Sequence, residues 1–485
     1  MTVGLVLAAI LCGPAMVSGA LVGSGGAETP GHAWVQQWTA EGWPAWPVGT
    51  AGALGTDPWP VIDPLPTWLA AGLAQLVGPT SAWNALWVCW IVLAAVGGGA
   101  WARAMGGEGG VGAVAVPLMP IWLGSLTSGL TEDGAVGLLA LALAALVSGR
   151  VRLGGLLLGL LAWCGLYLAW LGAAVAVVVG GWRLWRGAGA RWTLARSWAV
   201  GGLLAGLLAV PAAAPFRARL AGEGHHAGTP PVQEEPRWRV NPVRRADVAA
   251  FVVPGHAASG PGREHPTYAG WVTIGLAAAG GWNPAWVGVA ALAAVAVDEP
   301  VFVAGKPRVS TNPVARAFAA LPLADRFNHR ARLWILGDLL LVGLAARGAA
   351  RLRDRWRLAG WFGARARLAF LTAALAAEVA FLSPARVPLP GMSPSTPAIY
   401  AAISDLPEGP VAVAGAVGPG VNPQRVLFDQ RTHGRRLLVD PNRPGPVAAC
   451  RRCVLVALGD ARAGVEAVRG PPDRTAVDGA AWWIP

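Results

Sequence analysis

The sequence predicts a polytopic α-helical membrane protein of about eleven spans, followed by a small α/β domain over residues 385–485. Of the 485 residues, 54% are hydrophobic and 13% are charged, with a mean hydropathy of +0.49. Soluble domains carry about 25% charged residues. The arginines also gather between long apolar runs, and after residue 384 these runs give way to short β-rich segments. Composition therefore excludes an ordinary soluble protein.

The apolar runs define the predicted spans. The first extends from Val3 to Gly23 and lacks a positively charged start, so we expect an uncleaved helix rather than a signal peptide. We expect the runs 153–181 and 268–297 to cross twice each, with turns near Cys164–Gly165 and Gly281–Pro284. The other runs lie near 83–102, 110–129, 134–149, 197–215, 333–348 and 368–384.

Charge orients these spans. No basic residue precedes Arg103, whereas segment 347–367 holds seven arginines and one acid. Basic residues are retained on the cytoplasmic side of a membrane, so we predict the N-terminus inside, loop 24–80 outside and the C-terminus outside. The net charge of +12 then reflects topology rather than nucleic-acid binding. Loop 216–266, predicted outside, is an exception with seven arginines and five acids.

The loop 24–80 carries the first group of candidate residues. Glu28 and His32 follow the first span, and Asp57 lies further along the loop. A carboxylate at the membrane surface can act as a general base on a hydroxyl, or hold a divalent cation against a phosphate. We predict Glu28 and Asp57 to be catalytic and His32 to contact substrate. The alternative is that these acids only solvate an outer loop.

Two further groups lie at predicted outer ends of spans. Glu132 and Asp133 are adjacent acids, which are expensive near lipid and are suited to bind Mg²⁺ or Mn²⁺. Arg326 and Arg330 enter a later span, and guanidinium groups bind phosphate in a bidentate manner. A solvated turn is the alternative for the acids. Interfacial arginines that only snorkel are the alternative for Arg326 and Arg330.

The tail is predicted to form an outer α/β domain that shapes access to the site rather than doing chemistry. Its histidine, His433, is expected to be a solvated loop residue, and Cys450 and Cys453 to be a structural disulfide or idle thiols. The predicted domains are therefore 1–384 and 385–485. Predicted strands lie at Val411–Val417, Arg425–Phe428, Leu437–Asp440 and Val454–Leu458, with a helix at Ala461–Val468.

A series of motifs, taken in order, resembles bacterial multi-pass glycosyltransferases of the GT-C superfamily that carry a small outer C-terminal domain. Glu28 stands where an aspartate is more usual in this resemblance. The matching residues are Trp34, Pro47–Gly49, Asp57–Pro58, Asn84, Asp247–Pro254, His265–Gly270 with Tyr268, Leu323–Arg332, Glu378, Tyr400–Pro407 and Gln430–Gly434.

The resemblance implies a GT-C-like fold in the bacterial cytoplasmic membrane. It implies transfer of a sugar from a polyprenyl-phosphate-linked donor to a glycan, lipid or protein acceptor on the outer face, often with a divalent cation. It also places Tyr268 among the substrate contacts. The alternative class is a non-catalytic transporter, lipid flippase or envelope-assembly scaffold. A transporter would want ionisable residues deep in the spans, where Asp338 and Glu378 stand out.

Overall fold

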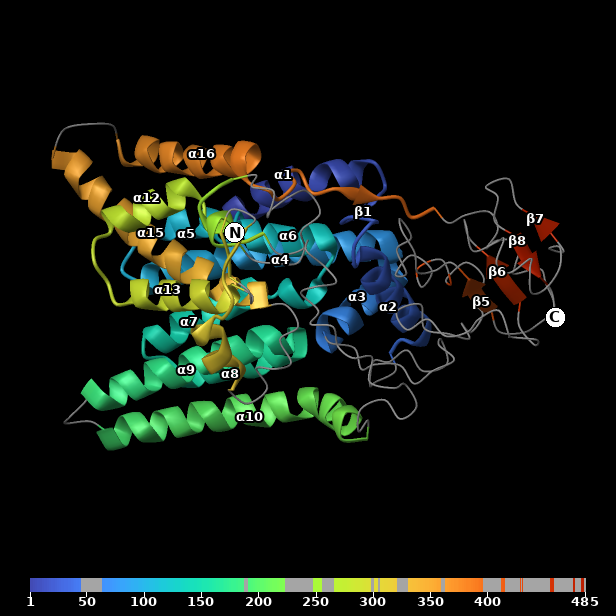
Figure 1. Cartoon of the computed structure of the whole chain (residues 1–485), viewed down its shortest axis with the longest axis horizontal. Helices are drawn as coiled ribbons and strands as arrows, with labels where there is room; N and C mark the ends of the chain where they lie inside the picture. Colours follow the sequence, from blue (N-terminus) through green and yellow to red (C-terminus); the bar gives the residue numbers. More distant parts are fainter. Residues whose placement is uncertain are drawn as a thin grey trace. The chain divides into compact units, whose positions relative to one another are not determined.

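A computed structural model describes the protein as two compact units (Figure 1). The first unit comprises 1–14, 87–127 and 131–390, and the second comprises 15–86, 128–130 and 391–485. The predicted division at residue 384 stays a prediction. The described residues are 1–44, 63–186, 191–222, 247–254, 266–297, 301–303, 306–320, 330–358, 363–395, 411–414, 428, 430, 454–457, 474–475 and 481–483.

The first unit is a bundle of apolar helices. Helix α4 begins in the second unit and enters this one at Trp87. A 3-10 turn, η1 (Thr131–Asp133), precedes α7, and another, η6 (Arg330–Leu333), precedes α15. The principal helices are α1 (Thr2–Val17), α4 (Pro79–Ala104), α5 (Gly109–Ala115), α6 (Pro120–Ser128), α7 (Val136–Val147), α8 (Val151–Cys164), α9 (Leu166–Arg186), α10 (Arg191–Gly222), α12 (Trp271–Ala279), α13 (Ala285–Ala296), α14 (Pro313–Ala319), α15 (Trp334–Leu358) and α16 (Ala364–Leu382).

Helices α7 to α10 pack together, and helices consecutive in the chain run in opposite directions, so that α8 and α10, which lie side by side, run in the same direction. Gly172 of α9 lies against Leu158 of α8, and Arg183 near the end of α9 donates to the Val147 carbonyl beside the start of α8. Helix α8 therefore runs against α9, and the chain reverses at Gly165. The predicted turn near Cys164–Gly165 is confirmed, because one residue separates the two helices.

Helices α12 and α13 flank α15 and also form a hairpin (Figure 1). Gly280 at the end of α12 and Gly281 lie beside Gly348 and Arg351 of α15, whereas Gly288 of α13 lies beside Leu340. Arg351 also donates to the Gly280 carbonyl. The predicted turn near Gly281–Pro284 is therefore confirmed. Gly281 has φ +68°, a conformation that glycine adopts without steric strain.

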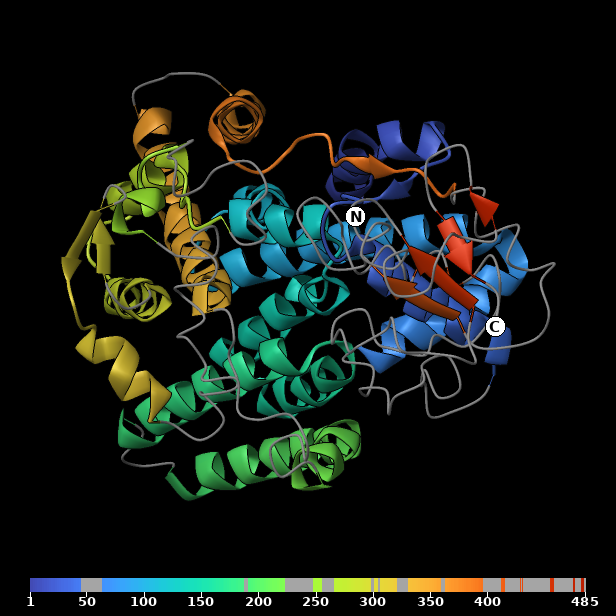
Figure 2. The same ribbon diagram turned by 45° about the vertical axis from the view of Figure 1, so that its right-hand side comes forward.

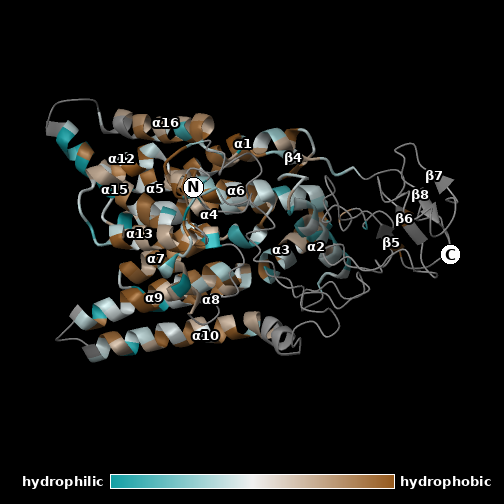
Figure 3. Ribbon diagram, in the orientation of Figure 1, coloured by the Kyte–Doolittle hydropathy of each residue, from teal (hydrophilic) through white to brown (hydrophobic). Residues whose placement is uncertain are grey.

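Arginines of α9 and of segment 347–367 gather at one end of this bundle, here named the arginine end. Arg353 pairs with Glu108, and the Glu108 N–H donates to the Ala346 carbonyl at 3.0 Å. Arg183 and Arg351 lie at the corresponding ends of α9 and α15. Figure 3 shows the polar residues of α9 and α15 at the same end of the layer. Which side of the membrane this end faces stays a prediction.

Glycines allow these helices to approach closely. A Cβ on Gly348 would overlap the Leu276 carbonyl, and a Cβ on Gly155 would overlap the Gly201 carbonyl. A Cβ on Gly97 would likewise overlap the Gly137 carbonyl. Small residues serve this purpose in membranes, where helices associate through close packing rather than through exclusion of water.

The helices support a membrane protein, as predicted. Five helical stretches of the described chain are long and apolar enough to cross a bilayer: Pro79–Ala104, Gly109–Ser128, Leu166–Trp185, Trp192–Ala214 and Arg330–Trp356. Shorter apolar helices accompany them, so the count of eleven spans stays a prediction. The predicted first helix is wrong at its end. It stops at Val17. Residues Leu21–Val22 form a strand, and Gly19 and Gly23 on either side of it have positive φ angles.

The second unit contains α2 (Thr29–Gly42), α3 (Pro64–Val77) and the strand pair β1 (Leu21–Val22) and β4 (Gly391–Met392). Asn84 fixes β1 because its side chain accepts from the Val22 N–H and donates to the Ala20 carbonyl, both at 2.9 Å. Trp34 of α2 is buried at 3% exposure, and its ring centroid lies 6.2 Å from that of Trp38 on the same helix.

The tail contributes a four-stranded sheet in the order β5-β6-β8-β7 (Figure 2). The strands are β5 (Val411–Ala414), β6 (Val454–Ala457), β7 (Arg474–Thr475) and β8 (Ala481–Trp483), and β5 pairs with β6 in parallel. The first and last predicted strands are confirmed. Phe428, predicted to end a strand, is helical instead. Residues 425–427, 437–440 and 461–468 lie outside the described residues, as do His433, Cys450 and Cys453.

We expect opposite accessibility for two exposed positions in a cysteine-free background. Glu41→Cys, in α2, should react with an impermeant maleimide in intact cells. Asp354→Cys, at the arginine end, should react only after permeabilisation, because arginine-rich ends are retained inside. Mass-tag gel shifts measure both. Labelling of Asp354→Cys in intact cells would contradict the predicted topology.

We expect Gly348→Ala to destabilise the bundle by about 1–3 kcal/mol, because the new methyl group would force α12 and α15 apart. Thermal unfolding in detergent measures this. Gly202→Ala in α10 is the matched control, since its Cβ would meet nothing within 4 Å. An equal loss in both variants would show that the effect does not arise from helix packing.

Candidate functional site

A buried ionic cluster lies where η1 meets η6 in the first unit. Arg332 Nη2 lies 3.0 Å from Glu132 Oε1, and Arg332 Nε lies 3.7 Å from Asp133 Oδ2. Glu132, Asp133 and Arg332 are 2%, 0% and 8% exposed. One guanidinium therefore joins two adjacent carboxylates, although about 200 residues separate the two segments in the chain. We name these three residues the Arg332 cluster.

Helix α6 holds the acidic side of the cluster in place. Ser125 Oγ donates to Asp133 Oδ2, and the Trp122 indole N–H donates to the Asp133 backbone carbonyl, both at 2.9 Å. These residues lie one turn apart on α6, so one helix face presents both donors. Asp133 is thus fixed through its side chain and its backbone.

Helices α8 and α9 close the other side of the cluster. A Cβ on Gly165 would overlap the Glu132 carbonyl, so only glycine permits this approach. Tyr167, two residues later, presents its ring to the Arg332 guanidinium at 5.2 Å from the ring centroid. Such cation–π contact favours a desolvated arginine. The α8–α9 turn therefore contributes both a close backbone contact and an aromatic wall.

The structure brings some predicted residues together. Glu132 and Asp133 share the cluster, and Arg330 lies in η6 beside it with intermediate exposure. Arg326 lies outside the described residues. The alternative of a solvated turn is wrong for the acids, because both are buried.

Other predicted residues lie elsewhere. Glu28 is the N-cap residue of α2, and His32 lies one turn later, with its N–H donating to the Glu28 carbonyl at 3.2 Å. Both belong to the second unit, and Asp57 lies outside the described residues. Tyr268 is in the first unit, where its hydroxyl donates to Glu378 Oε1 at 2.8 Å.

Sequence reasoning did not select Arg332. Its motif was recognised, but the phosphate role was given to Arg326 and Arg330. The available signal was position: Arg332 is the last charged residue before an apolar span, and such a residue needs a buried counter-ion. The acid pair before another span was the matching partner.

The donor atoms of the Arg332 cluster show whether it is suited to bind the predicted divalent cation. Carboxylate oxygens suit Mg²⁺, which is usually held by one or two carboxylates together with substrate phosphates. Glu132 and Asp133 meet that requirement. No group of three His, Cys, Asp or Glu side chains comes together among the described residues, so a cage made wholly of protein ligands is not seen there.

The sequence and the structure were compared with those of known proteins, and one solved membrane protein has a similar fold. No family model and no curated protein matches the sequence. The archaeal oligosaccharyltransferase AglB from Archaeoglobus fulgidus, in complex with an inhibitory peptide and a dolichol-phosphate, is similar with a TM-score of 0.53 and 12% identity. That match covers 94% of this chain and 69% of AglB.

Two further solved structures are more distant. The apo oligosaccharyltransferase of Archaeoglobus fulgidus has a TM-score of 0.48 and 12% identity over 90% of this chain and 64% of its own. Apo ArnT from Cupriavidus metallidurans has a TM-score of 0.42 and 13% identity over 97% and 96%.

The chain is a polytopic α-helical membrane protein. Its fold is, more particularly, similar to that of the archaeal oligosaccharyltransferase AglB, in line with the resemblance that the sequence motifs indicated. The predicted resemblance is thereby confirmed at the level of the fold. At 12% identity the likeness carries no residue roles, which depend on the site itself.

We expect Arg332→Met to destabilise the first unit by about 3–5 kcal/mol, because it leaves two buried carboxylates without their counter-charge. Adding Glu132→Gln and Asp133→Asn should restore part of this loss. Thermal unfolding in detergent measures both changes. The matched control is Arg353→Met, whose pair with Glu108 is partly exposed, and a loss below about 1 kcal/mol is expected. Equal losses at both sites would contradict a special role for burial.

Proposed function

We propose that this protein transfers a sugar from a polyprenyl-phosphate-linked donor to an acceptor on the outer face of the bacterial cytoplasmic membrane. The observation that carries the proposal is the Arg332 cluster, a fixed set of acidic and basic groups at the end of the spans opposite the arginine end. The GT-C fold supports it, since AglB was solved with a lipid phosphate of the dolichol type.

Arg330 is the group we assign to the donor phosphate. It shares η6 with Arg332, and the pairing of Arg332 with Glu132 and Asp133 anchors that turn against η1. Arg332 thus acts as a positioning residue, and Arg330 offers a planar set of N–H donors that match phosphate oxygens. Arg326, six residues before Arg332, is the second candidate for this contact.

The reaction needs a base as well as charge neutralisation. The acceptor hydroxyl forms a bond to the anomeric carbon, while the bond from that carbon to the donor phosphate oxygen breaks. Glu28 takes the hydroxyl proton, with Asp57 as the second carboxylate and His32 as a substrate contact. Negative charge builds on the departing lipid phosphate, where preorganised cationic groups are most effective. A divalent cation on Glu132 and Asp133 would supply further neutralisation when bound.

A transporter or lipid flippase is the second candidate. It is favoured by the meeting of Asp338 and Glu378 in one pocket of the first unit, deep in the bundle. Sugar transfer by purified protein separates the two classes, because a transporter would move its cargo without changing it.

A transfer assay with radiolabelled polyprenyl-phosphate sugar and membranes should separate the role of the base, Glu28, from that of the phosphate-binding residue, Arg330. Glu28→Gln should lower kcat about 100-fold or more, because a general base contributes about 10²–10⁴. Arg330→Gln should mainly raise KM by weakening phosphate binding. Arg353→Gln, at the arginine end, is the control and should be unchanged. EDTA should abolish transfer and Mg²⁺ or Mn²⁺ should restore it.

The proposal would fail if Glu28→Gln and Arg330→Gln both transferred sugar at the wild-type rate. If transfer survives EDTA, the divalent cation is excluded from the mechanism, but the rest of the proposal stands. Wild-type membranes that bind the lipid donor, yet never form a glycosylated product, would favour the transporter class.

A further inference from the structure

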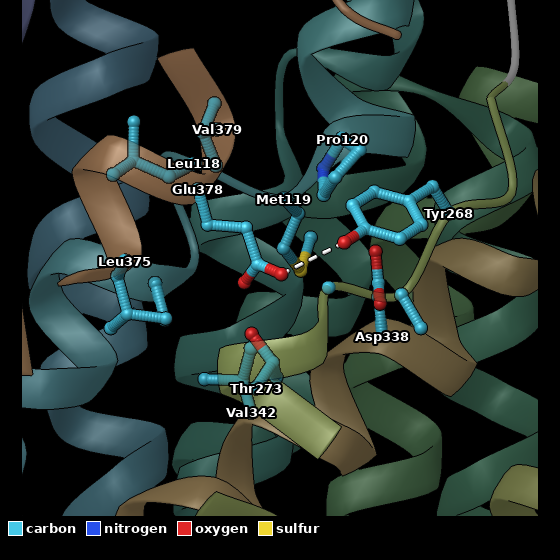
Figure 4. A pocket seen from close by; sticks show the side chains of 13 residues that line it. Leu118, Met119, Pro120, Tyr268, Thr273, Asp338, Val342, Leu375, Glu378 and Val379 are labelled. Atoms are coloured by element: carbon cyan, nitrogen blue, oxygen red, sulfur yellow. Dashed lines mark hydrogen bonds between the residues drawn. The ribbon is translucent and has the colours of Figure 1, made fainter. Parts of the chain in front are cut away.

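A second polar site lies inside the bundle, between α5, α6, α12, α15 and α16 (Figure 4). Its polar lining consists of Tyr268, Thr273, Asp338 and Glu378, and apolar side chains such as Met119 complete the wall. The cavity volume is about 20 Å³, which is room for one water-sized particle. Neither the Arg332 cluster nor the proposed transfer reaction uses Thr273, Asp338 or Glu378.

Two interruptions of regular helix meet at this pocket. Helix α5 ends at Ala115 and α6 begins at Pro120, because Pro117 and Pro120 lack the N–H groups that would continue the helix. Helix α12 begins at Trp271, after a buried non-helical stretch, 266–270. Irregular backbone at membrane depth is tolerated where it is buried in protein or lines a cavity. Broken helices of this kind form ion and substrate sites in membrane transporters.

The negative charge of the Glu378 carboxylate is compensated by hydrogen-bond donors at the start of α12. Its Oε1 accepts from the Tyr268 hydroxyl and the Trp271 N–H, and its Oε2 accepts from the Val272 N–H at 3.0 Å. The N-terminus of a helix carries a partial positive charge, which stabilises a carboxylate there. Gly270, at φ +83°, allows the approach, since a Cβ would lie 3.0 Å from Glu378 Oε2. The charge of Glu378 is thus already compensated.

Asp338 has no such compensation. It is 1% exposed, and its Oδ2 has no hydrogen-bond partner in the described part of the chain. The residues that line the pocket include no Arg, Lys or His. An isolated buried carboxylate anion is strongly unfavourable, so this position calls for a proton or a cation to neutralise it.

We propose that the pocket binds one small monovalent cation of the size of Na⁺, with Asp338 as the charged ligand and the hydroxyl oxygens of Thr273 and Tyr268 as neutral ligands. All three donors are oxygen atoms, which hard cations prefer. A single uncompensated negative charge matches a single positive charge, and the cavity admits one particle. The cation would hold α12 and α15 together at the level where α12 begins.

The test is thermal unfolding of the purified full chain in detergent, at increasing NaCl. Total chloride is kept constant with N-methyl-D-glucamine. We expect a saturable rise of Tm with Na⁺, because a ligand that binds only the folded state stabilises it by mass action. Binding of ²²Na⁺ should saturate at about one ion per chain. A Tm that is unchanged by Na⁺, with no saturable ²²Na⁺ binding, would overturn the proposal.

Variants connect the response to the pocket. Asp338→Asn should abolish the Na⁺-dependent rise, and Thr273→Val should shift it to higher Na⁺. Thr127→Val, the same substitution at a threonine outside the pocket lining, is the control and should respond as the wild type does. If Asp338→Asn does not fold, Thr273→Val and ²²Na⁺ binding by the wild type still decide. A Na⁺ response retained in Asp338→Asn would overturn the assignment, as would stability that follows pH and ignores Na⁺, which would identify a proton.

Discussion

The arrangement of the first unit depends on one buried arginine between two carboxylates. Charges removed from water and placed near lipid are unfavourable unless their partners are close. Arg332 can therefore occupy its position only while Glu132 and Asp133 are within reach, and the reverse also holds. This mutual requirement fixes the start of α15 against the start of α7, and Trp122, Ser125 and Gly165 are arranged around it.

The features predictable from sequence were those with a local cause. Apolar runs gave the helices, and glycine or proline within overlong runs gave the two reversals at Gly165 and near Gly281. Proximity of distant segments had no local signal. Arg332 could have been matched to the acid pair only by its need for a counter-ion, and the pairing of Leu21–Val22 with Gly391–Met392 joins residues about 370 positions apart. In the tail, Phe428 stands in a β-rich run but is helical, and strand propensity depends strongly on context.

Helix α15 connects the two polar sites of the bundle. Arg332 immediately precedes it, and Asp338 follows six residues later, about 9 Å along the axis. One site holds a basic group between acids, whereas the other holds an acid among hydroxyls and apolar walls. The turn before α15 and the start of α15 thus carry opposite charges at two depths. A rigid helix start links the geometry of the two sites, because neither site can shift without moving the other.

The short length of α8 has a consequence for the lipid around it. With 14 residues it is about 21 Å long, whereas the hydrocarbon layer of a bilayer is about 30 Å thick. Its first turn carries Arg152, which anchors that end in the headgroup region, and Leu153, Leu156 and Leu160 are exposed along its side. Hydrophobic mismatch then leaves two outcomes: the leaflet thins beside α8, or Gly165 lies several ångströms below the headgroups. In the first case the headgroups approach the depth of the Glu132 backbone, which Gly165 touches, whereas in the second case that backbone lies below the headgroups.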